Sequence, residues 1–329
     1  MSRRRGVRGV VTAALVAAAV VGCARKGARS FRPVDAFGPA DADLVVKASP
    51  AGIIGSRFYS QAIEAISGMP GSSFPGGKPP EAVLEEEMGV DATDIVELAV
   101  CADLGTDEFT IAATTGKPFD RDAALAFMSK GGPKIEKLEA HGGVDLLGAK
   151  GEEDTVVAFP TANLVVLGTK DAVRQGIDRL KAGKAAKLGS RMAGALDAAP
   201  EGHDLVVAVV ATPGLAKTAA GVARLPDVAQ KLAFAAMAMK VGDSLDLDVI
   251  AEFNTEEDAR EAREQATRHI EAEKSRTLEQ AEMEPLRALL EGIKIGGEGK
   301  VAELTVSVPA DAVKALVASR LSRTGGGIP

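Results

Sequence analysis

Aromatic residues are scarce in this chain. Its 329 residues include no tryptophan, one tyrosine (Tyr59) and ten phenylalanines, which are scattered through apolar segments. Surfaces that bind sugars or single-stranded nucleic acid usually present exposed aromatic rings for stacking. The composition therefore disfavours both of these functions.

Histidine and cysteine are also rare, which limits metal and redox chemistry. The three histidines, His141, His203 and His269, stand far apart, and none has the H-x-x-x-H spacing that brings two imidazoles together on a helix. We therefore expect no metal site and no cofactor. Of the two cysteines, Cys101 lies in the apolar segment "DIVELAVCAD", which predicts a buried small side chain rather than a reactive thiol.

The N-terminus combines arginines with an apolar run. Arginines at positions 3, 4, 5 and 8 precede the apolar segment 10–21. Twelve helical residues span about 18 Å, whereas the bilayer core is about 30 Å thick, so the segment predicts a signal peptide rather than a transmembrane helix. The segment ends in Val20-Val21-Gly22-Cys23, which resembles the lipobox of bacterial lipoproteins.

This resemblance implies cleavage before Cys23 and acylation of its thiol. Two or three acyl chains at the mature N-terminus are enough for stable anchoring in a bilayer. The protein is then expected in the bacterial cell envelope, and Ala24 implies the outer membrane, facing the periplasm or the surface. With Cys23 acylated, Cys101 has no partner for an intrachain disulfide. An ordinary secretory signal with a chance cysteine is the alternative.

Basic residues are outnumbered by acidic ones. The chain has 39 lysines and arginines against 46 aspartates and glutamates, a formal net charge of -7. Removal of residues 1–22 would take away four arginines and make the charge of the mature chain more negative still. An acidic protein is not suited to binding nucleic acid, so we expect contact with the membrane through the lipid alone.

Three pairs of segments recur in the same order. Pro39–Val46 and Pro200–Val207 share the pattern P-x-x-x-D-L-V-V. Further on, "FTIAATTGKPFDRDAALAF" matches "LDLDVIAEFNTEEDAREA", and "NLVVLGTKDAVRQGI" matches "AELTVSVPADAVKALV". We interpret these matches as two copies of one unit, 39–188 and 191–322. A signal peptide (1–22), a lipidated tether (23–38) and a flexible tail (323–329) complete the chain.

Each copy mixes short strands with helices. Phe159–Asn163 and Gly296–Gly299 are typical of turns between strands, and Thr255 with Asp258 predicts a cap on a charged helix running to about Glu284. We expect an α+β fold, in which two tandem units each have a largely antiparallel sheet with helices packed on it. Residues 39 to about 180 also resemble a module of uncharacterised bacterial exported proteins, through the turn Gly116–Asp120 and the "VVLGT" strand. That resemblance implies a fold and no activity.

Two further features are candidates for chemistry. Asp246 and Asp248 lie two apart on a predicted strand, so both carboxylates point to one face about 7 Å apart. They could hold a cation or act as an acid/base pair, and the alternative is a solvated sheet face. The segment 231–241, "KLAFAAMAMKV", predicts a buried helix leading into a strand, and the alternative is the lining of a lipid-binding groove.

Together these features favour a non-enzymatic, lipid-anchored envelope protein that acts as a binding or scaffold module, with a protein partner in the envelope. The sequence assigns no catalytic, cofactor-binding or metal-binding residue, and Cys23 is its one site of modification. A carrier of a lipid or other apolar ligand is the alternative. A third hypothesis is an enzyme that uses Asp246 and Asp248. The oligomeric state, the ligand and the pathway are left open.

Overall fold

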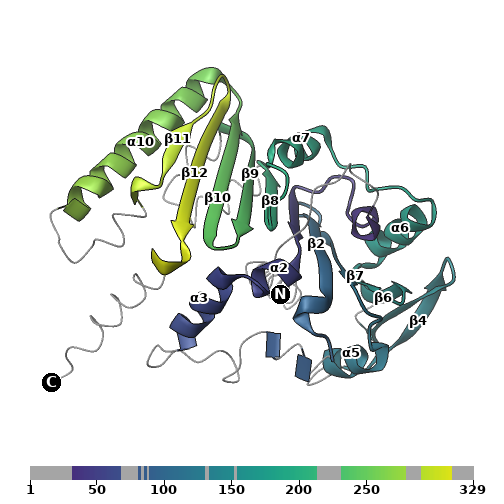
Figure 1. The fold of residues 1–329 in the computed structure, drawn as a ribbon. Coiled ribbons are helices and arrows are strands. Elements are labelled where there is room, and N and C mark those ends of the chain that lie inside the picture. Colours follow the sequence, from purple (N-terminus) through teal and green to yellow (C-terminus); the bar gives the residue numbers. More distant parts are fainter. Residues whose placement is uncertain are drawn as a thin grey trace, which may run out of the picture.

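The computed structural model describes residues 32–67, 81–82, 85–86, 89–129, 133–151, 154–212, 231–278 and 290–312. Within them, one twelve-stranded sheet with antiparallel neighbours runs through the molecule (Figure 1). The mixed α+β fold with a largely antiparallel sheet is thereby confirmed. The strands are β1 (Leu44–Ala48), β2 (Ile95–Asp103), β3 (Glu108–Thr115), β4 (Ile135–His141), β5 (Val144–Ala149), β6 (Thr155–Thr161), β7 (Leu164–Thr169), β8 (Leu205–Val210), β9 (Leu232–Val241), β10 (Ser244–Phe253), β11 (Lys294–Gly296) and β12 (Val301–Pro309).

The strand order is β11-β12-β10-β9-β8-β1-β2-β3-β7-β6-β5-β4. The N-terminal half of the sheet, β1 to β7, therefore meets the C-terminal half, β8 to β12, at the β1–β8 pair. From this pair outward, each half begins with a three-strand meander, β1-β2-β3 on one side and β8-β9-β10 on the other. The next strand outward, β7 or β12, enters after the chain has passed through a helix and at least one further strand.

Helices and short 3-10 turns connect the strands. They are η1 (Pro33–Ala36), α2 (Pro50–Ile54), α3 (Arg57–Ser67), η3 (Ala92–Asp94), α5 (Arg121–Met128), α6 (Lys170–Lys181), α7 (Ser190–Ala198) and α10 (Glu256–Leu278). Within the described ranges, no helix combines the length and the apolar character needed to cross a bilayer.

Local signals in the sequence start several of these helices. Pro50 occupies the first turn of α2 directly after Ser49. The Asp120 carboxylate accepts a hydrogen bond from the Ala123 N–H at 2.9 Å and caps α5. Thr255 Oγ1 accepts from the Asp258 N–H at 3.1 Å at the start of α10. The predicted cap at Thr255 is therefore confirmed, as are the strand connections at Phe159–Asn163 and Gly296–Gly299.

One face of the sheet is covered by η1, α6 and α7. Phe37, Val173 and Ile177 pack there on the N-terminal half, and Met192 and Ala195 of α7 pack with β8 and β9. The opposite face carries a second apolar cluster on β1, β2, β3 and β8. Next to it, α2 and α3 contribute Ile53 and Tyr59, which pack on Val241 and Met239. The sheet is therefore the middle layer, with apolar clusters on both of its faces.

The segment 32–38 is folded, although the sequence predicted it as the end of a tether. Val34, Ala36 and Phe37 are buried. Arg179 of α6 donates to the carbonyls of Ala36 and Gly38, both at 2.8 Å. The Phe37 ring lies so close to Gly176 that a Cβ built there would be 2.1 Å from a ring carbon. The prediction of a tether reaching to residue 38 is wrong because these apolar side chains complete the core.

The segment 231–241 also differs from its prediction. It is strand β9 from Leu232 onward, paired with β8 on one side and β10 on the other, rather than a helix leading into a strand. Phe234, Ala236 and Ala238 are buried. An alanine-rich segment favours a helix by intrinsic propensity, but two neighbouring strands satisfy its backbone groups and override that preference.

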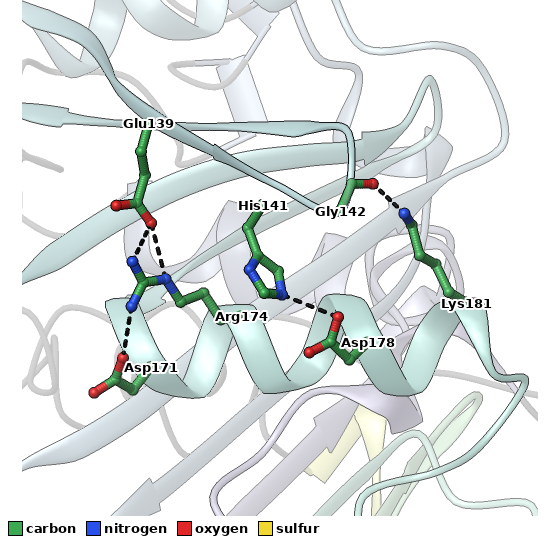
Figure 2. Close-up of polar contacts among 7 residues, drawn as sticks. All are labelled: Glu139, His141, Gly142, Asp171, Arg174, Asp178 and Lys181. Atoms are coloured by element: carbon green, nitrogen blue, oxygen red, sulfur yellow. Dashed lines mark hydrogen bonds and ion pairs between the residues drawn. The ribbon is translucent and has the colours of Figure 1, made fainter.

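Ion pairs tie the edge strand β4 to α6 (Figure 2). Glu139 accepts hydrogen bonds from Arg174 and forms an ion pair with Lys170 at 2.9 Å. His141 Nε2 lies 2.9 Å from Asp178 Oδ1, and Lys181 contacts the Gly142 carbonyl. Lys170 and Arg174 hold the pKa of Glu139 below its usual range. These contacts fix the last strand of the sheet against the helix and so have a structural role.

Candidate functional site

A groove of about 740 Å³ lies on the face of the sheet that α7 covers. Its floor is formed where the two halves of the sheet meet, by Val45 and Lys47 of β1, Ala99 and Cys101 of β2, and Val206 of β8. In the strand register Val45 is opposite Cys101, and Lys47 is opposite both Ala99 and Val206. Residues that pair directly share a face, so these side chains all lie on the same side of the sheet. Val45, Ala99 and Cys101 are almost fully covered there, whereas Lys47 and Val206 are half-buried.

The walls of the groove come from segments on either side of this floor. One wall is η1 with the loop 183–188, and the other is α7 with the turn 199–204. Leu188 and Leu196 contribute apolar surface to these walls. The groove thus exists because α7 and η1 approach the sheet from different directions and leave the strands between them uncovered.

One end of the groove carries a network of four charged side chains. Lys47 Nζ lies 2.6 Å from Asp35 Oδ1, Arg32 Nε lies 3.5 Å from Asp35 Oδ2, and Arg32 also contacts Glu97. Lys47 and Glu97 are both inward-facing residues of strands and are only 31% and 12% exposed. Charges in such a position are tolerated because each has an opposite charge beside it.

Burial raises the pKa of the Glu97 carboxyl, and the neighbouring Arg32 opposes this shift. Cys101 lies on the floor close to the same network and is fully enclosed. Burial raises the pKa of its thiol to about 11, which keeps the sulfur protonated and unreactive. The prediction that Cys101 is a buried, inert side chain agrees with this geometry.

The other end of the groove is formed by the turn before β8. His203 lies there, with its Nε2 2.9 Å from Asp248 Oδ2 and its Nδ1 2.9 Å from the Pro200 carbonyl oxygen. Its side chain is 10% exposed. Pro200, Glu201 and Gly202 of this turn are exposed, and the His203 imidazole is covered because it bridges the turn to β10. Asp197 and Glu201 line the same end.

The carboxylates that the sequence singled out, Asp246 and Asp248, share one face of β10, as predicted. Ser307 donates to Asp246 at 2.5 Å, and Asp248 contacts His203. Neither carboxylate lines the groove. Of the other histidines, His141 pairs with Asp178, and His269 lies exposed on α10. In the described part of the chain, no three His, Cys, Asp or Glu side chains are grouped so that they could hold a metal ion.

Cys23 lies outside the described residues, so its predicted acylation stays a prediction. The groove residues Asp35, Lys47 and Glu97 were not identified from the sequence. One signal was present: Lys47 interrupts the apolar strand "DLVVKA", whereas the matching strand continues "DLVVAV" with Ala208. A lysine at an otherwise apolar strand position indicates that the surface it faces is not packed.

No family model matches the chain, and no curated protein does. Among solved structures, the chain is similar to crystal forms I, III and IV of TP0453, each with a TM-score of 0.49. The sequence identity is 12% for forms I and III and 11% for form IV. The match to form I covers 89% of this chain and 98% of TP0453, and the other two cover similar shares. With TM-scores below 0.5, these matches carry no argument about the site.

Proposed function

We propose that this protein is lipid-anchored in the bacterial cell envelope through Cys23 and acts there as a non-enzymatic module that binds a ligand in the groove. The observation that carries the binding role is the groove of about 740 Å³, which falls within the range of about 300–1,000 Å³ typical of ligand sites. The anchor rests on the lipobox pattern Val20–Cys23, and Ala24 favours the outer membrane.

The proposal includes a body made of two tandem copies of one α+β unit. The β1–β8 pair supports this, because Leu44 is opposite Val209 and Ala48 is opposite Leu205, with Val46 opposite Val207. In the recurring pattern Val207 is the counterpart of Val46. A two-fold axis between these two valines would exchange β1 with β8 and would produce this pairing.

Two buried aspartates follow the same symmetry. The Asp43 N–H donates to the Ala102 carbonyl, and the Asp43 carboxylate accepts from the Leu104 N–H at 2.9 Å. Asp204, its counterpart in the pattern, donates in the same way to Met239 and accepts from the Val241 N–H. Both side chains are buried. A repeated unit explains why the same residue has the same contacts in both halves.

A carrier of a lipid or other apolar ligand is the second candidate function. It was first suggested by the segment 231–241, but this segment is a central strand and does not line the groove. The groove itself now supports this candidate, since it lies where the two proposed units meet and has Leu188 and Leu196 in its walls. Its charged ends favour a ligand that is not wholly apolar.

The anchor is tested by metabolic labelling with a radioactive fatty acid in a bacterial host. We expect label on the wild-type chain and on Cys101→Ala, which removes the other cysteine, and none on Cys23→Ala. The labelled chains should fractionate with the membrane, and Cys23→Ala should be released by washing. Equal labelling of Cys23→Ala and the wild type would exclude acylation at Cys23.

A further inference from the structure

We propose that Lys184, Lys187 and Arg191, on the loop between α6 and α7 and the first turn of α7, dock on the anionic head groups of the membrane that holds the protein. This docking deepens the proposed function and rests on it for one point, the presence of a membrane close to the folded body. The acidic net charge of the chain predicts contact with the membrane through the lipid alone. The charge around this loop has the opposite sign.

The segment 179–196 is rich in cations and lacks acids. It comprises the end of α6, the loop and most of α7, and it contains no aspartate or glutamate. Its five cations are Arg179, Lys181, Lys184, Lys187 and Arg191. At physiological ionic strength, exposed charges more than about 8 Å apart are screened from each other. A local group of cations therefore attracts a nearby anionic surface even though the whole chain is acidic.

Three of these cations are available to a partner. Arg179 and Lys181 donate to backbone carbonyls and so serve the fold. Lys184, Lys187 and Arg191 are exposed, and in the part of the chain that the structure describes their side chains have no ion-pair or hydrogen-bond partner. An anionic surface can therefore bind them without breaking a contact within the protein.

The loop presents charge but little apolar surface. Leu188 packs against the buried cluster under α7. The other residues between the three cations are small: Ala185, Ala186, Gly189 and Ser190. Protein interfaces usually depend on large side chains such as Trp or Tyr that fill a pocket on the partner. An anionic bilayer attracts basic residues by charge alone, so the loop suits a membrane better than a protein partner.

The loop also lies beside the segment that leads back to the predicted anchor. The Ala186 N–H donates to the Asp35 carbonyl at 2.7 Å, which ties the loop to η1. Figure 1 shows the loop on the outside of the molecule between α6 and α7. Arg32, directly before η1, is nine residues after Cys23, and nine residues span at most about 30 Å when fully extended. An acylated Cys23 would therefore keep the loop near the bilayer surface.

Binding of the unacylated chain to vesicles tests the role of charge. The purified Cys23→Ala chain is titrated with vesicles of phosphatidylcholine alone and with vesicles that also contain phosphatidylglycerol. We expect binding to the anionic vesicles only, and weaker binding as salt is added. A basic residue near an anionic bilayer strengthens binding about fivefold, so the triple variant Lys184→Gln, Lys187→Gln, Arg191→Gln should bind about 100-fold more weakly.

A matched control removes the same charge from another surface. Arg260→Gln, Arg268→Gln and Arg276→Gln neutralise three exposed arginines of α10, which lies beside β11 and β12 at the other end of the sheet. Screening should limit the effect of this control to about twofold. Equal losses in the two triple variants would show that net charge alone governs binding and would refute the loop as the docking surface. Circular dichroism verifies that each variant is folded.

The docked orientation is tested on the acylated chain in the same vesicles. A fluorophore is attached at Ala185→Cys on the loop or, in a second chain, at Ser275→Cys on α10, and energy transfer to an acceptor on the lipid head groups is measured. Cys101 is buried and does not compete for the label. We expect phosphatidylglycerol to raise transfer from the loop and not from α10. Equal transfer from the two positions would overturn the docked orientation.

The remaining outcomes separate this proposal from others. If the Cys23→Ala chain fails to bind phosphatidylglycerol vesicles but binds a polyglutamate peptide through the same three cations, the loop is a site for an acidic protein and the membrane contact is refuted. Because the vesicle titration uses a chain without acyl groups, failure of the fatty-acid labelling at Cys23 would overturn the anchor and leave that titration unaffected.

Discussion

The two halves of the sheet have the same backbone pairing where they meet but differ in what their strands carry. Leu44 is opposite Ala102 in the N-terminal half, as Leu205 is opposite Met239 in the C-terminal half. In this common register, Lys47 corresponds to Ala208 and Glu97 to Phe234. The two halves therefore share one backbone register, while the side chains on the face covered by α7 and η1 differ in charge and size.

The cover over each half differs accordingly. In the C-terminal half, Met192 and Ala195 of α7 form one buried cluster with Phe234 and Ala208. In the N-terminal half, Lys47 and Glu97 line the groove beside η1. Charged side chains that need water or an ionic partner resist burial under an apolar helix. The groove thus lies over the half whose strands carry Lys47 and Glu97, where the other half carries Ala208 and Phe234.

The largest effect is expected from Phe37→Ala, which breaks the cover of the N-terminal half. Loss of a buried phenylalanine leaves a cavity and should lower the free energy of unfolding by about 3–5 kcal/mol. The matched change on the other cover, Met192→Ala, should cost about 2–5 kcal/mol. Urea denaturation of the Cys23→Ala chain measures both. A loss below about 1 kcal/mol for Phe37→Ala would mean that 32–38 is not part of the folded body.

Smaller effects are expected from removal of the two buried aspartates. Asp43→Ala deprives the Leu104 N–H and the Thr212 hydroxyl of their acceptor, and Asp204→Ala does the same to the Val241 N–H. A buried donor left without a partner costs about 1–3 kcal/mol. Urea denaturation should show similar losses in the free energy of unfolding for the two variants, which would support the equivalence of the two halves. A loss at only one of the two positions would contradict that equivalence.

The smallest effect concerns the pH dependence at Glu97, since Phe234 at the corresponding position cannot titrate. Burial raises the pKa of the Glu97 carboxyl above its ordinary value of 4.5. A carboxyl whose pKa is higher in the folded than in the unfolded state stabilises the fold in its protonated form. This stabilisation is complete at a pH below the unfolded pKa and is lost as the pH rises through the folded pKa. Above pH 4.5, the wild type should therefore lose stability relative to Glu97→Gln. Urea midpoints of both chains across pH 4 to 8 test this, and a constant difference between them would contradict it.

Much of the fold could be predicted because its signals are local. The segment around Asp246 and Asp248 was predicted as a strand and is β10, Thr255 was predicted as a helix cap, and Gly296–Gly299 was predicted as a turn. The site could be predicted far less well. Asp35, Lys47 and Glu97 belong to three separate segments, and only their packing brings them together. His203 likewise finds Asp248 across 45 positions of the chain.

The sequence by itself determined the alternation of the strands, the caps and turns between them, the acidic composition and the expectation of an anchor at Cys23, because these depend on neighbouring residues and on composition. The tertiary structure decided that 231–241 is a strand, that 32–38 is packed and that a groove opens over β1, β2 and β8. These outcomes depend on partners distant in sequence: β8 and β10 for β9, α6 for Phe37, and α7 with η1 for the groove. Their contacts outweigh local preferences, since burial and backbone pairing between segments exceed the intrinsic propensity of any one segment.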